Sequence, residues 1–400
     1  MSRPRALVLT GSLGMGHHVV TEVVADSLEQ MGWSTGVFDC MSMLGRLSGK
    51  TGDWVFRHIM DTPTLYDGVH FSHFRTASRL AALVDWGATK RLVPALADHL
   101  VREPVDLLVS TFATGASTIA KLGSEGNMAR PPARVALCTD VCMHSLWVRE
   151  GMNLFLVTSE AAAASVRRYL PRAPIAIVPA PVRPQFHQAP TQAKARATLG
   201  IDPEARCALV MGGGWGLGPL AETAEALAAH GVVVLVVAGH NEPLAVALDQ
   251  VARRQPGVVP FRFTDQIPTL MAACDLVLTT PGATTCSEAR VVSRPLLLLD
   301  VMPGHGRDNV QHELELGQAD VCDADPGRLV ECALGALERS APPGTSRPDA
   351  DRFGREFASA LAMVGIFPSL PEDNLLLPDQ AIPPAPTHTH TPTPTPEEVL

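Results

Sequence analysis

Short apolar runs, each followed by a glycine-rich or polar turn, recur along the first part of the chain. The first run lies at residues 6–10, a turn follows at 11–17, and residues 19–31 carry apolar side chains at helical spacing. Further β-prone runs that are apolar on both faces lie at 36–39, 106–110, 133–137 and 154–157. Such strands are typical of a parallel sheet that helices cover on both sides.

The same pattern begins again near Cys207. A strand is predicted at 208–211, a glycine-rich turn at 212–216 and an alanine-rich helix at 219–230. Further strands are predicted at 232–238, 275–279 and 295–299. The chain is therefore expected to be an α/β protein with two successive β/α arrays, each of which opens with a strand and a glycine-rich turn.

Proline and low-complexity segments divide the chain. The proline-rich segment near residue 182 breaks regular structure, so we expect a first domain at 1–182 and a second at 183–345. A C-terminal helix within 346–367 is expected to pack back on the body. Residues 368–400 are rich in Pro, Thr and His, which cannot bury a core, and we expect them to be disordered.

Composition excludes several classes of protein. The formal net charge of -9 argues against a nucleic-acid partner, because such proteins usually carry a basic excess. The apolar run at 6–9 is too short for a secretory signal core, and no run reaches the roughly 20 apolar residues that span a bilayer. The eight cysteines form no CxxC pair, so we expect reduced thiols in a cytosolic protein.

Residues 279–289 follow a predicted strand and open a predicted helix. Gly282 permits a tight turn, and the backbone N–H groups at the helix start attract anions, to which the hydroxyls of Thr284 and Thr285 add donors. Glu288 lies one turn inside the helix, where it could accept both hydroxyls of a ribose. The alternative is a capped helix with a surface glutamate.

A second candidate site is the glycine-rich turn that contains Gly212, Gly213 and Gly214, where the backbone can approach a ligand closely. It is not the dinucleotide fingerprint, because no acidic residue stands at the end of the strand that follows, at 232–238. The alternative is an ordinary tight turn between strand and helix, which needs only one or two glycines.

A third candidate site lies at the carboxyl ends of first-domain strands, where doubly wound folds bind ligands. Gly14 and Gly16 precede His17, whose imidazole could act as a base on an acceptor hydroxyl. Asp140 follows another strand and could take the same proton. The alternatives are a structural histidine and an aspartate that caps the next helix.

Residues 41–96 are locally basic in an acidic chain, with seven Lys and Arg against four Asp. The segment is also rich in Met, Leu, Phe and Trp. This composition suits contact with an anionic membrane surface. The alternative is an amphipathic helical excursion that packs on the domain.

Together these segments resemble the diacylglycerol glucosyltransferases and monogalactosyldiacylglycerol synthases, and more distantly the N-acetylglucosaminyltransferase that forms lipid II. The resemblance covers roughly residues 5–335. The motifs occur in order: Gly14-Met15-Gly16-His17; Thr139-Asp140 with His144 and Trp147; Pro181-Val182-Arg183-Pro184-Gln185-Phe186; Gly212-Gly213-Gly214; Gly239-His240-Asn241-Glu242-Pro243-Leu244; Phe263 to Met271; Pro281-Gly282 through Glu288-Ala289; and Pro303-Gly304 through Asn309.

The resemblance implies a GT-B fold, in which two Rossmann-like domains face a central cleft. It implies an inverting transfer of a hexose from a UDP-sugar to a lipid acceptor such as diacylglycerol, without a metal ion or other cofactor, at the cytosolic membrane face. His17 or Asp140 is then the base. Residues implied in acceptor binding are Gly14, Gly16, His144 and Trp147. Residues implied in nucleotide-sugar binding are Gly212, Gly213, Gly214, Asn241, Phe263, Thr264, Gly282, Ala283, Thr284, Thr285, Glu288, His305 and Asn309.

The chain departs from the family pattern at two places. Thr280-Pro281-Gly282-Ala283 stands where the family usually has Lys-Pro-Gly-Gly, and Pro303-Gly304-His305-Gly306 stands where it usually has Pro-Gly-Gln-Glu. The missing Gln is the residue expected to read the donor sugar, so the sugar stays open. The alternative functions are a same-fold enzyme for a soluble acceptor, a UDP-sugar epimerase, and a non-catalytic nucleotide-sugar-binding protein.

Overall fold

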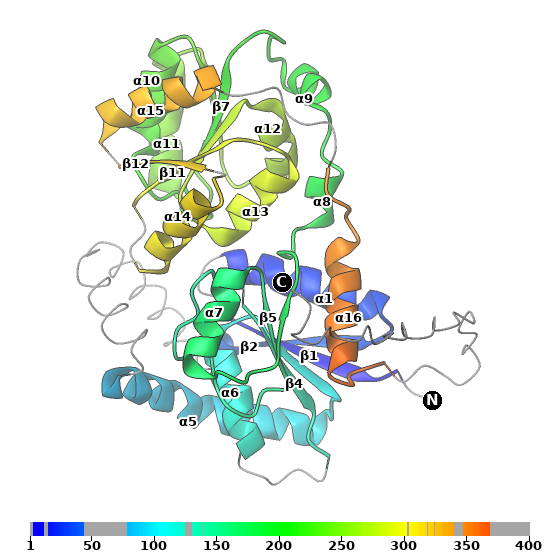
Figure 1. Ribbon diagram of the computed structural model, residues 1–400. Helices are drawn as coiled ribbons and strands as arrows, with labels where there is room; N and C mark the ends of the chain where they lie inside the picture. The colour runs from blue at the N-terminus through cyan, green and yellow to red at the C-terminus, as the bar shows by residue number, and fades with distance from the viewer. Residues whose placement is uncertain are drawn as a thin grey trace, which may run out of the picture. The chain divides into compact units, whose positions relative to one another are not determined.

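The computed structural model contains two parallel six-stranded sheets flanked by helices (Figure 1), which confirms the predicted fold class. The structure describes residues 3–11, 15–43, 78–124, 130–138, 140–301, 304–317, 319–323, 325–339 and 347–368. Within these residues, no helix has the length and apolar character that a membrane crossing requires.

The first sheet has the strand order β2-β1-β3-β4-β5-β6. Alternate residues of a strand point to opposite faces, so Leu7 and Leu9 join one core while Ala6 and Val8 join the other. The strands are β1 (Arg5–Thr10), β2 (Ser34–Asp39), β3 (Leu107–Ser110), β4 (Ala133–Leu137), β5 (Leu154–Val157) and β6 (Ile175–Ile177). The helices are α1 (Met15–Gln30), α2 (Cys40–Met43), α5 (Arg79–Arg102), α6 (Ala113–Ser124) and α7 (Glu160–Tyr169).

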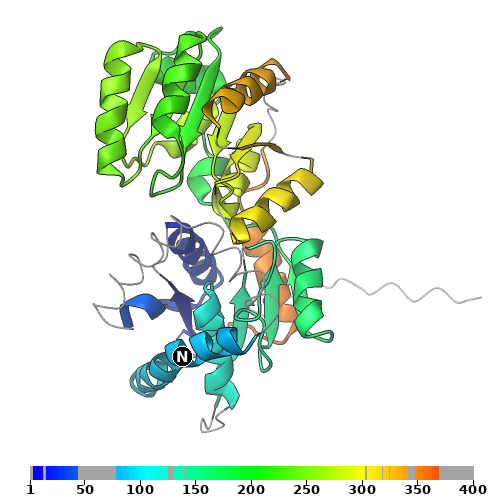
Figure 2. The same ribbon diagram turned by 90° about the vertical axis from the view of Figure 1, so that its left-hand side faces the viewer.

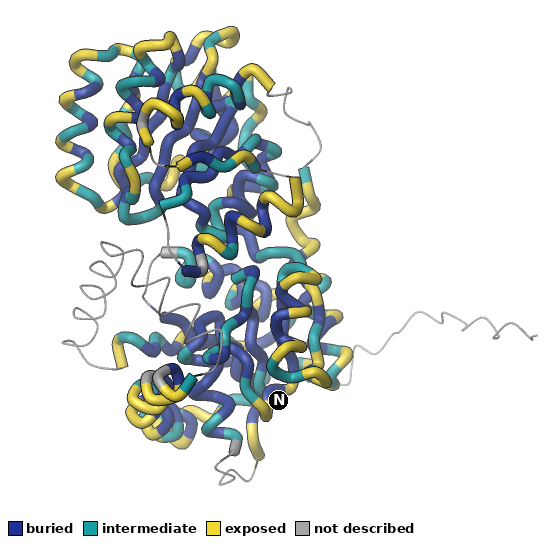
Figure 3. Tube along the Cα trace, turned by 60° about the vertical axis from the view of Figure 1, so that its left-hand side comes forward, coloured by how far each residue is buried: buried dark blue, intermediate teal, exposed yellow. Residues whose placement is uncertain are grey.

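The second sheet has the order β12-β11-β10-β7-β8-β9 and is built in the same way. Figure 3 shows both sheets as buried tubes, with exposed residues concentrated on the helices around them. The strands are β7 (Cys207–Met211), β8 (Val233–Val237), β9 (Val258–Phe261), β10 (Leu276–Thr279), β11 (Leu296–Leu299) and β12 (Ala319–Cys322). The helices are α8 (Pro184–His187), α9 (Gln192–Leu199), α10 (Leu220–Ala229), α11 (Glu242–Arg254), α12 (Ile267–Ala273), α13 (Ala283–Val291), α14 (His305–Glu315) and α15 (Pro326–Arg339).

The last described helix, α16 (Arg352–Met363), packs on the first sheet although it follows the second one in sequence. Phe353 and Phe357 are buried in the same core as Val20 of α1. Figures 1 and 2 both show α16 beside the strands of the first sheet. The chain therefore returns to the first sheet before residue 369. The predicted tail lies outside the described residues from residue 369 on, as do residues 44–77 of the locally basic segment.

Three strands were not predicted, and all three form edges of the sheets: β6, β9 and β12. Each contains intermediate or exposed positions instead of a continuous buried run. An edge strand has a neighbour on one side only, so it needs no continuous apolar sequence. The first helix also begins earlier than expected, at Met15, which places His17 in its first turn.

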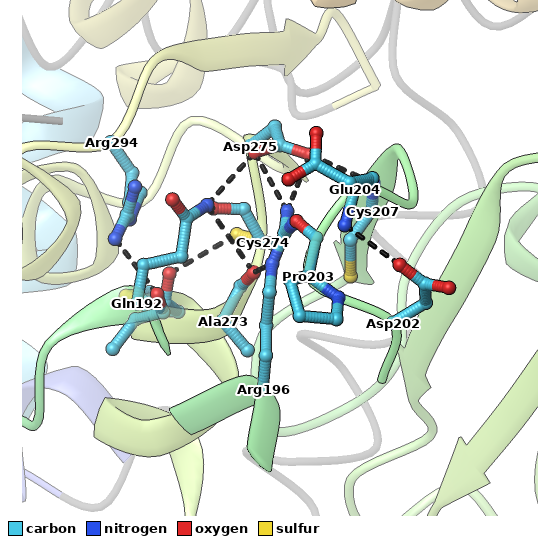
Figure 4. Close-up of polar contacts among 12 residues, drawn as sticks. Gln192, Arg196, Asp202, Pro203, Glu204, Cys207, Ala273, Cys274, Asp275 and Arg294 are labelled. Atoms are coloured by element: carbon cyan, nitrogen blue, oxygen red, sulfur yellow. Dashed lines mark hydrogen bonds and ion pairs between the residues drawn. The ribbon is translucent and has the colours of Figure 1, made fainter. Parts of the chain in front are cut away.

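A polar network ties α9 to the starts of β7 and β10 (Figure 4). Arg196 donates to both carboxylate oxygens of Asp275, at 2.9 and 2.8 Å, and Gln192 donates to Oδ1 at 2.8 Å. The N–H of Cys207 donates to Oδ2 of the same aspartate at 2.9 Å. The network fixes β7 and β10 at their amino ends, and their carboxyl ends carry the loops of the candidate site.

Candidate active site

A cavity of about 290 Å³ lies at the carboxyl ends of strands from both sheets. It is lined by the starts of α1 and α13 and by the loops that follow β7 and β10. Most residues that the sequence singles out meet in its lining: Gly16, His17, Asp140, Gly212, Gly213, Gly214, Phe263, Thr264, Gly282, Ala283, Thr284, Thr285, Glu288 and Asn309. Gly14 lies outside the described residues.

His17 is held in one orientation by the backbone. Its Nδ1 lies 3.0 Å from the carbonyl oxygen of Thr111, and since a carbonyl only accepts, Nδ1 carries the proton. Nε2 is then the nitrogen that can take a proton from a substrate. The Phe112 ring meets the imidazole edge-on, with centroids 5.2 Å apart. Burial lowers the pKa of His17 below 6.5, and the charge of Asp140 opposes that effect.

Thr111 is itself fixed, so its carbonyl is a rigid acceptor. Its N–H donates to the carbonyl of Leu9 at 2.9 Å, which extends the pairing of β1 with β3. Its hydroxyl lies 2.8 Å from the hydroxyl of Thr21 in the second turn of α1. The orientation of His17 therefore follows from the sheet and helix that carry it.

Asp140 lines the cavity, but the two residues that were expected to bind the acceptor near it, His144 and Trp147, do not. The indole Nε1 of Trp147 donates to Asp140 Oδ2 at 3.3 Å, and Trp147 is only 1% exposed. His144 Nδ1 accepts the N–H of Leu146 at 3.3 Å. Neither residue is part of the cavity lining, so the structure gives Trp147 the place of a support for Asp140.

The glycine-rich loop after β7 needs its glycines. A Cβ on Gly212 would overlap the backbone of Leu217, whose N–H donates to the Gly212 carbonyl at 2.9 Å. Gly213 has a φ of +65°, a conformation that side chains disfavour. Asn241 supports this loop from behind: its Oδ1 caps α11, and its Nδ2 donates to the Trp215 carbonyl at 3.3 Å. Asn241 does not line the cavity.

The start of α13 faces the cavity without a side-chain cap. Gly282 is the N-cap, and the first helical hydrogen bond runs from the N–H of Cys286 to the Gly282 carbonyl at 3.0 Å. The N–H groups of residues 283–285 precede that bond, and all three residues line the cavity. An uncapped helix start of this kind is suited to bind an anion.

Glu288 lies one turn further along α13 and is paired with Arg183, which was not singled out from the sequence. Nε and Nη2 of Arg183 donate to Oε1 of Glu288 at 3.2 and 2.9 Å. Both of these hydrogen bonds end on Oε1, so Arg183 leaves Oε2 available. Glu288 is 4% exposed, and this burial raises its pKa to about 7 although Arg183 lowers it.

Arg183 was missed because its role depends on a partner far along the chain. It lies in the proline-rich segment between the two arrays, where its guanidinium also stands 5.0 Å above the ring of the buried Phe186. Among the described residues that line the cavity, Arg183 is the only Lys or Arg. The acidic residues there are Asp140, Asp265 and Glu288, so Arg183 alone can bring a permanent positive charge to an anion.

Phe263 and Asn309 complete the lining on the side of the second sheet. The exposed Phe263 ring is stacked on His240, with centroids 4.1 Å apart and planes 16° from parallel. Asn309 is buried on α14, where its Nδ2 donates to the Pro281 carbonyl at 2.9 Å and its Oδ1 has no partner among the described residues. His305 begins α14, and its side chain lies outside the described parts.

No three His, Cys, Asp or Glu side chains come together as a possible metal site in the parts of the chain that are described. The remaining lining is largely apolar and consists of Val19, Met211, Trp215, Leu217, Val237, Gly239, Ile267 and Thr280. The arrangement thus brings the uncapped start of α13, the aromatic ring of Phe263 and the imidazole of His17 to one cavity.

Sequence comparison with known proteins shows similarity to glycosyltransferases. Residues 208–322 match the glycosyltransferase family 28 C-terminal domain. Monogalactosyldiacylglycerol synthase 2 of Arabidopsis thaliana is 33% identical over 196 residues, which cover 46% of this chain and 42% of that protein. The processive diacylglycerol beta-glucosyltransferase of Bacillus pumilus is 27% identical over 185 residues, which cover 45% of this chain and 48% of that protein.

A solved structure supports the fold. Arabidopsis thaliana UGT89C1 complexed with UDP matches with a TM-score of 0.58 and 15% identity, over 90% of this chain and 99% of that one. The predicted resemblance to glycolipid-forming glycosyltransferases and the GT-B fold are confirmed. The chain spans about half the length of the curated relatives just described.

Proposed function

We propose that this protein transfers a hexose from a UDP-sugar to the hydroxyl of a lipid, with diacylglycerol as the acceptor. The family 28 domain and the names of the two relatives support a glycosyltransferase that makes a glycolipid. The place of action that we propose is the cytosolic face of the cell membrane, where a water-soluble donor can meet a lipid acceptor.

The observation that carries the proposal is the meeting of Arg183 and the uncapped start of α13 in one cavity. A diphosphate needs positive charge and N–H donors as it leaves, and electrostatic stabilisation of that kind is often the largest contribution to catalysis. Arg183 and the N–H groups of residues 283–285 supply both, so we propose a transfer that needs no metal ion. The Oε2 atom of Glu288 is the acceptor that we assign to the ribose hydroxyls.

His17 is the base in this proposal, because its Nε2 is the free nitrogen of a fixed, neutral imidazole. Nε2 removes the proton of the acceptor hydroxyl while that oxygen forms a bond to the anomeric carbon of the donor. The bond from this carbon to the diphosphate oxygen breaks, and UDP leaves with the electron pair. One displacement inverts the anomeric configuration. The charge of Asp140 stabilises the imidazolium that forms.

The lining beside this site supports an acceptor with apolar character. Val19 of α1 and Leu217 of the loop after β7 line the same cavity as His17. Apolar side chains of this kind favour a lipid over a small polar acceptor, because burial of apolar surface stabilises the complex by about 25 cal/mol per Å².

The purified protein would be incubated with UDP-glucose, UDP-galactose and UDP-N-acetylglucosamine over vesicles that contain diacylglycerol. We expect labelled glycolipid from one of these donors, and a Kd for that donor that rises roughly 10- to 100-fold in Arg183→Met, since a charge-assisted hydrogen bond contributes about 1.5–3 kcal/mol. Arg253→Met, an exposed arginine on α11, is the matched control.

Each other outcome points to an alternative function. A converted UDP-sugar without any acceptor indicates an epimerase, and a sugar transferred only to a water-soluble compound indicates a soluble acceptor. Donor binding without turnover indicates a nucleotide-sugar-binding protein. Absence of both binding and labelled lipid refutes the proposal.

A further inference from the structure

A second cavity, of about 350 Å³, lies beside the cavity of the candidate active site, which we call the donor cavity. The first turn of α13 belongs to both, since Ala283 and Thr284 line each of them. Further along this helix, Ser287 and Val291 line the second cavity, whereas Glu288 lines the donor cavity. The second cavity therefore meets a different side of α13 from the one that carries Glu288.

Two segments that connect the sheets form another wall of the second cavity. Residues 179–182 lead from the first sheet towards the second, and residues 348–350 lead back towards α16. The two connections run side by side (Figure 1), and Nδ1 of His187 lies 3.0 Å from the carbonyl oxygen of Pro348. This wall is therefore built from backbone that the structure holds in place.

Three polar side chains are buried in the lining of the second cavity. Ser287 is 6% exposed, His312 8% and Glu313 3%. Apolar side chains line it as well, among them Val20 of α1 and Phe353 of α16. An apolar ligand would remove water from the polar groups without replacing its hydrogen bonds, which is unfavourable. The lining therefore suits a ligand that has both hydroxyl groups and C–H surface.

The charges in the lining of the second cavity are paired within the protein. Nη1 of Arg290 donates to both carboxylate oxygens of Glu313, at 2.6 and 2.5 Å. The other arginine and the aspartate of the lining, Arg352 and Asp349, are each paired with a residue of α16. Nη2 of Arg290 donates to Ser287 Oγ at 2.9 Å, so the Ser287 O–H serves as a donor. Since each of these charges has a partner, the cavity favours an uncharged ligand.

We propose that the second cavity binds an uncharged polyhydroxylated ligand of about the size of a hexose. Its volume lies at the lower end of the roughly 300–1,000 Å³ of small-molecule pockets, which suits a small ligand. A hydroxyl group donates and accepts, so it can pair with the Ser287 hydroxyl or the His312 imidazole, while the C–H face of a sugar ring packs on Phe353. Of the two cavities, His17 lines only the donor cavity, so this ligand is not the acceptor that the proposed base deprotonates.

Saturation-transfer NMR of the full chain with D-glucose, D-galactose and myo-inositol tests this site. UDP is present at saturation, so that sugars are kept out of the donor cavity. We expect at least one polyol to bind, and Ala350→Trp to abolish the signal, because the exposed Ala350 lines the second cavity and the indole would fill it. Ser287→Ala should raise the Kd about 3- to 10-fold, which is the usual effect of one lost hydrogen bond. Circular dichroism of each variant verifies that the changes leave the fold intact.

The matched controls carry the same changes outside the second cavity. Ala229→Trp alters an exposed alanine at the end of α10, and Ser359→Ala removes an exposed hydroxyl of α16. Both variants should bind the polyol as the unaltered chain does. The variants locate the ligand with or without UDP, so a failure of the proposed function is not mistaken for a failure of this site.

Three results would overturn the proposal. The first is that none of the three polyols binds, and the second is that Ala350→Trp leaves binding unchanged. The third is tighter binding of glucose 6-phosphate or of cyclohexanol than of the polyols, because the cavity would then select charge or apolar surface instead of hydroxyl groups.

Discussion

Glu288→Gln should make the protein more stable and less able to bind its donor. In the folded chain the pKa of Glu288 is raised from 4.5 to about 7, mainly by burial. A raised pKa means that this group's contribution to stability is fully present below pH 4.5 and is lost as the pH rises through about 7. At pH 8 the loss is about 3 kcal/mol, because each pKa unit corresponds to about 1.4 kcal/mol.

Glutamine is neutral at every pH, so the variant does not lose this stability as the pH rises. Urea unfolding should therefore show Glu288→Gln to be about 3 kcal/mol more stable than the unaltered chain at pH 8 and nearly equal to it at pH 4. Arg183 loses its partner in the variant but is 30% exposed, so water can replace the carboxylate. A variant that is less stable at pH 8 would show that the ion pair stabilises the fold and that the burial argument is wrong.

Donor binding should change in the opposite direction. A group with a pKa of about 7 is roughly one-tenth ionised at pH 6 and nine-tenths ionised at pH 8. If the carboxylate accepts the ribose hydroxyls, affinity for a UDP-sugar rises about tenfold across this range, and Glu288→Gln abolishes the dependence. Calorimetry with a UDP-sugar measures this, since its diphosphate diester does not titrate there.

Glu313→Gln is the matched control for the binding measurement. Glu313 is also buried and paired with an arginine, Arg290, but it lies outside the donor cavity. This variant should therefore keep the pH dependence of donor binding. A flat pH profile in the unaltered chain refutes the role given to Glu288.

Two further predictions concern His17 in the cavity and Arg196 in the network at the amino ends of β7 and β10. His17→Asn should lower the rate of transfer by about 10²- to 10⁴-fold with little change in donor affinity. The rate of the unaltered enzyme should fall as the pH drops through the lowered pKa of His17, below 6.5. An unchanged rate in the variant would show that another residue is the base. Arg196→Met should cost about 1.5–3 kcal/mol in urea unfolding, since it removes charge-assisted hydrogen bonds to Asp275, which keeps those from Gln192 and Cys207. The exposed Arg352→Met should cost less than about 1 kcal/mol. Equal losses would contradict the role of the network in Figure 4.

The sequence predicts the fold well because buried parallel strands leave a clear pattern. The runs at 208–211 and 276–278 are apolar at every position, and they lie in the central strands β7 and β10. The same rule explains which strands were missed. At an edge strand such as β12 most positions are exposed or only partly buried, and Asp320 interrupts the apolar run.

The candidate site was predicted only in part, because sequence patterns report local structure. Gly282 and Glu288 could be found from a turn and a helix start that lie close together in the chain. Arg183 could not, since its partner Glu288 lies 105 residues away. Trp147 has the right neighbours in sequence, but its indole points to Asp140 from behind the cavity. Which side of a residue faces a cavity depends on packing between distant elements.

The configuration of the product tests the central claim most directly. The unaltered protein would be given an α-linked UDP-hexose and diacylglycerol vesicles, and the anomeric proton of the glycolipid would be read by NMR. In the proposed mechanism His17 Nε2 activates the acceptor for one direct displacement, so the account predicts a β-glycoside. An α-glycoside, or no glycolipid from any UDP-hexose, would contradict it.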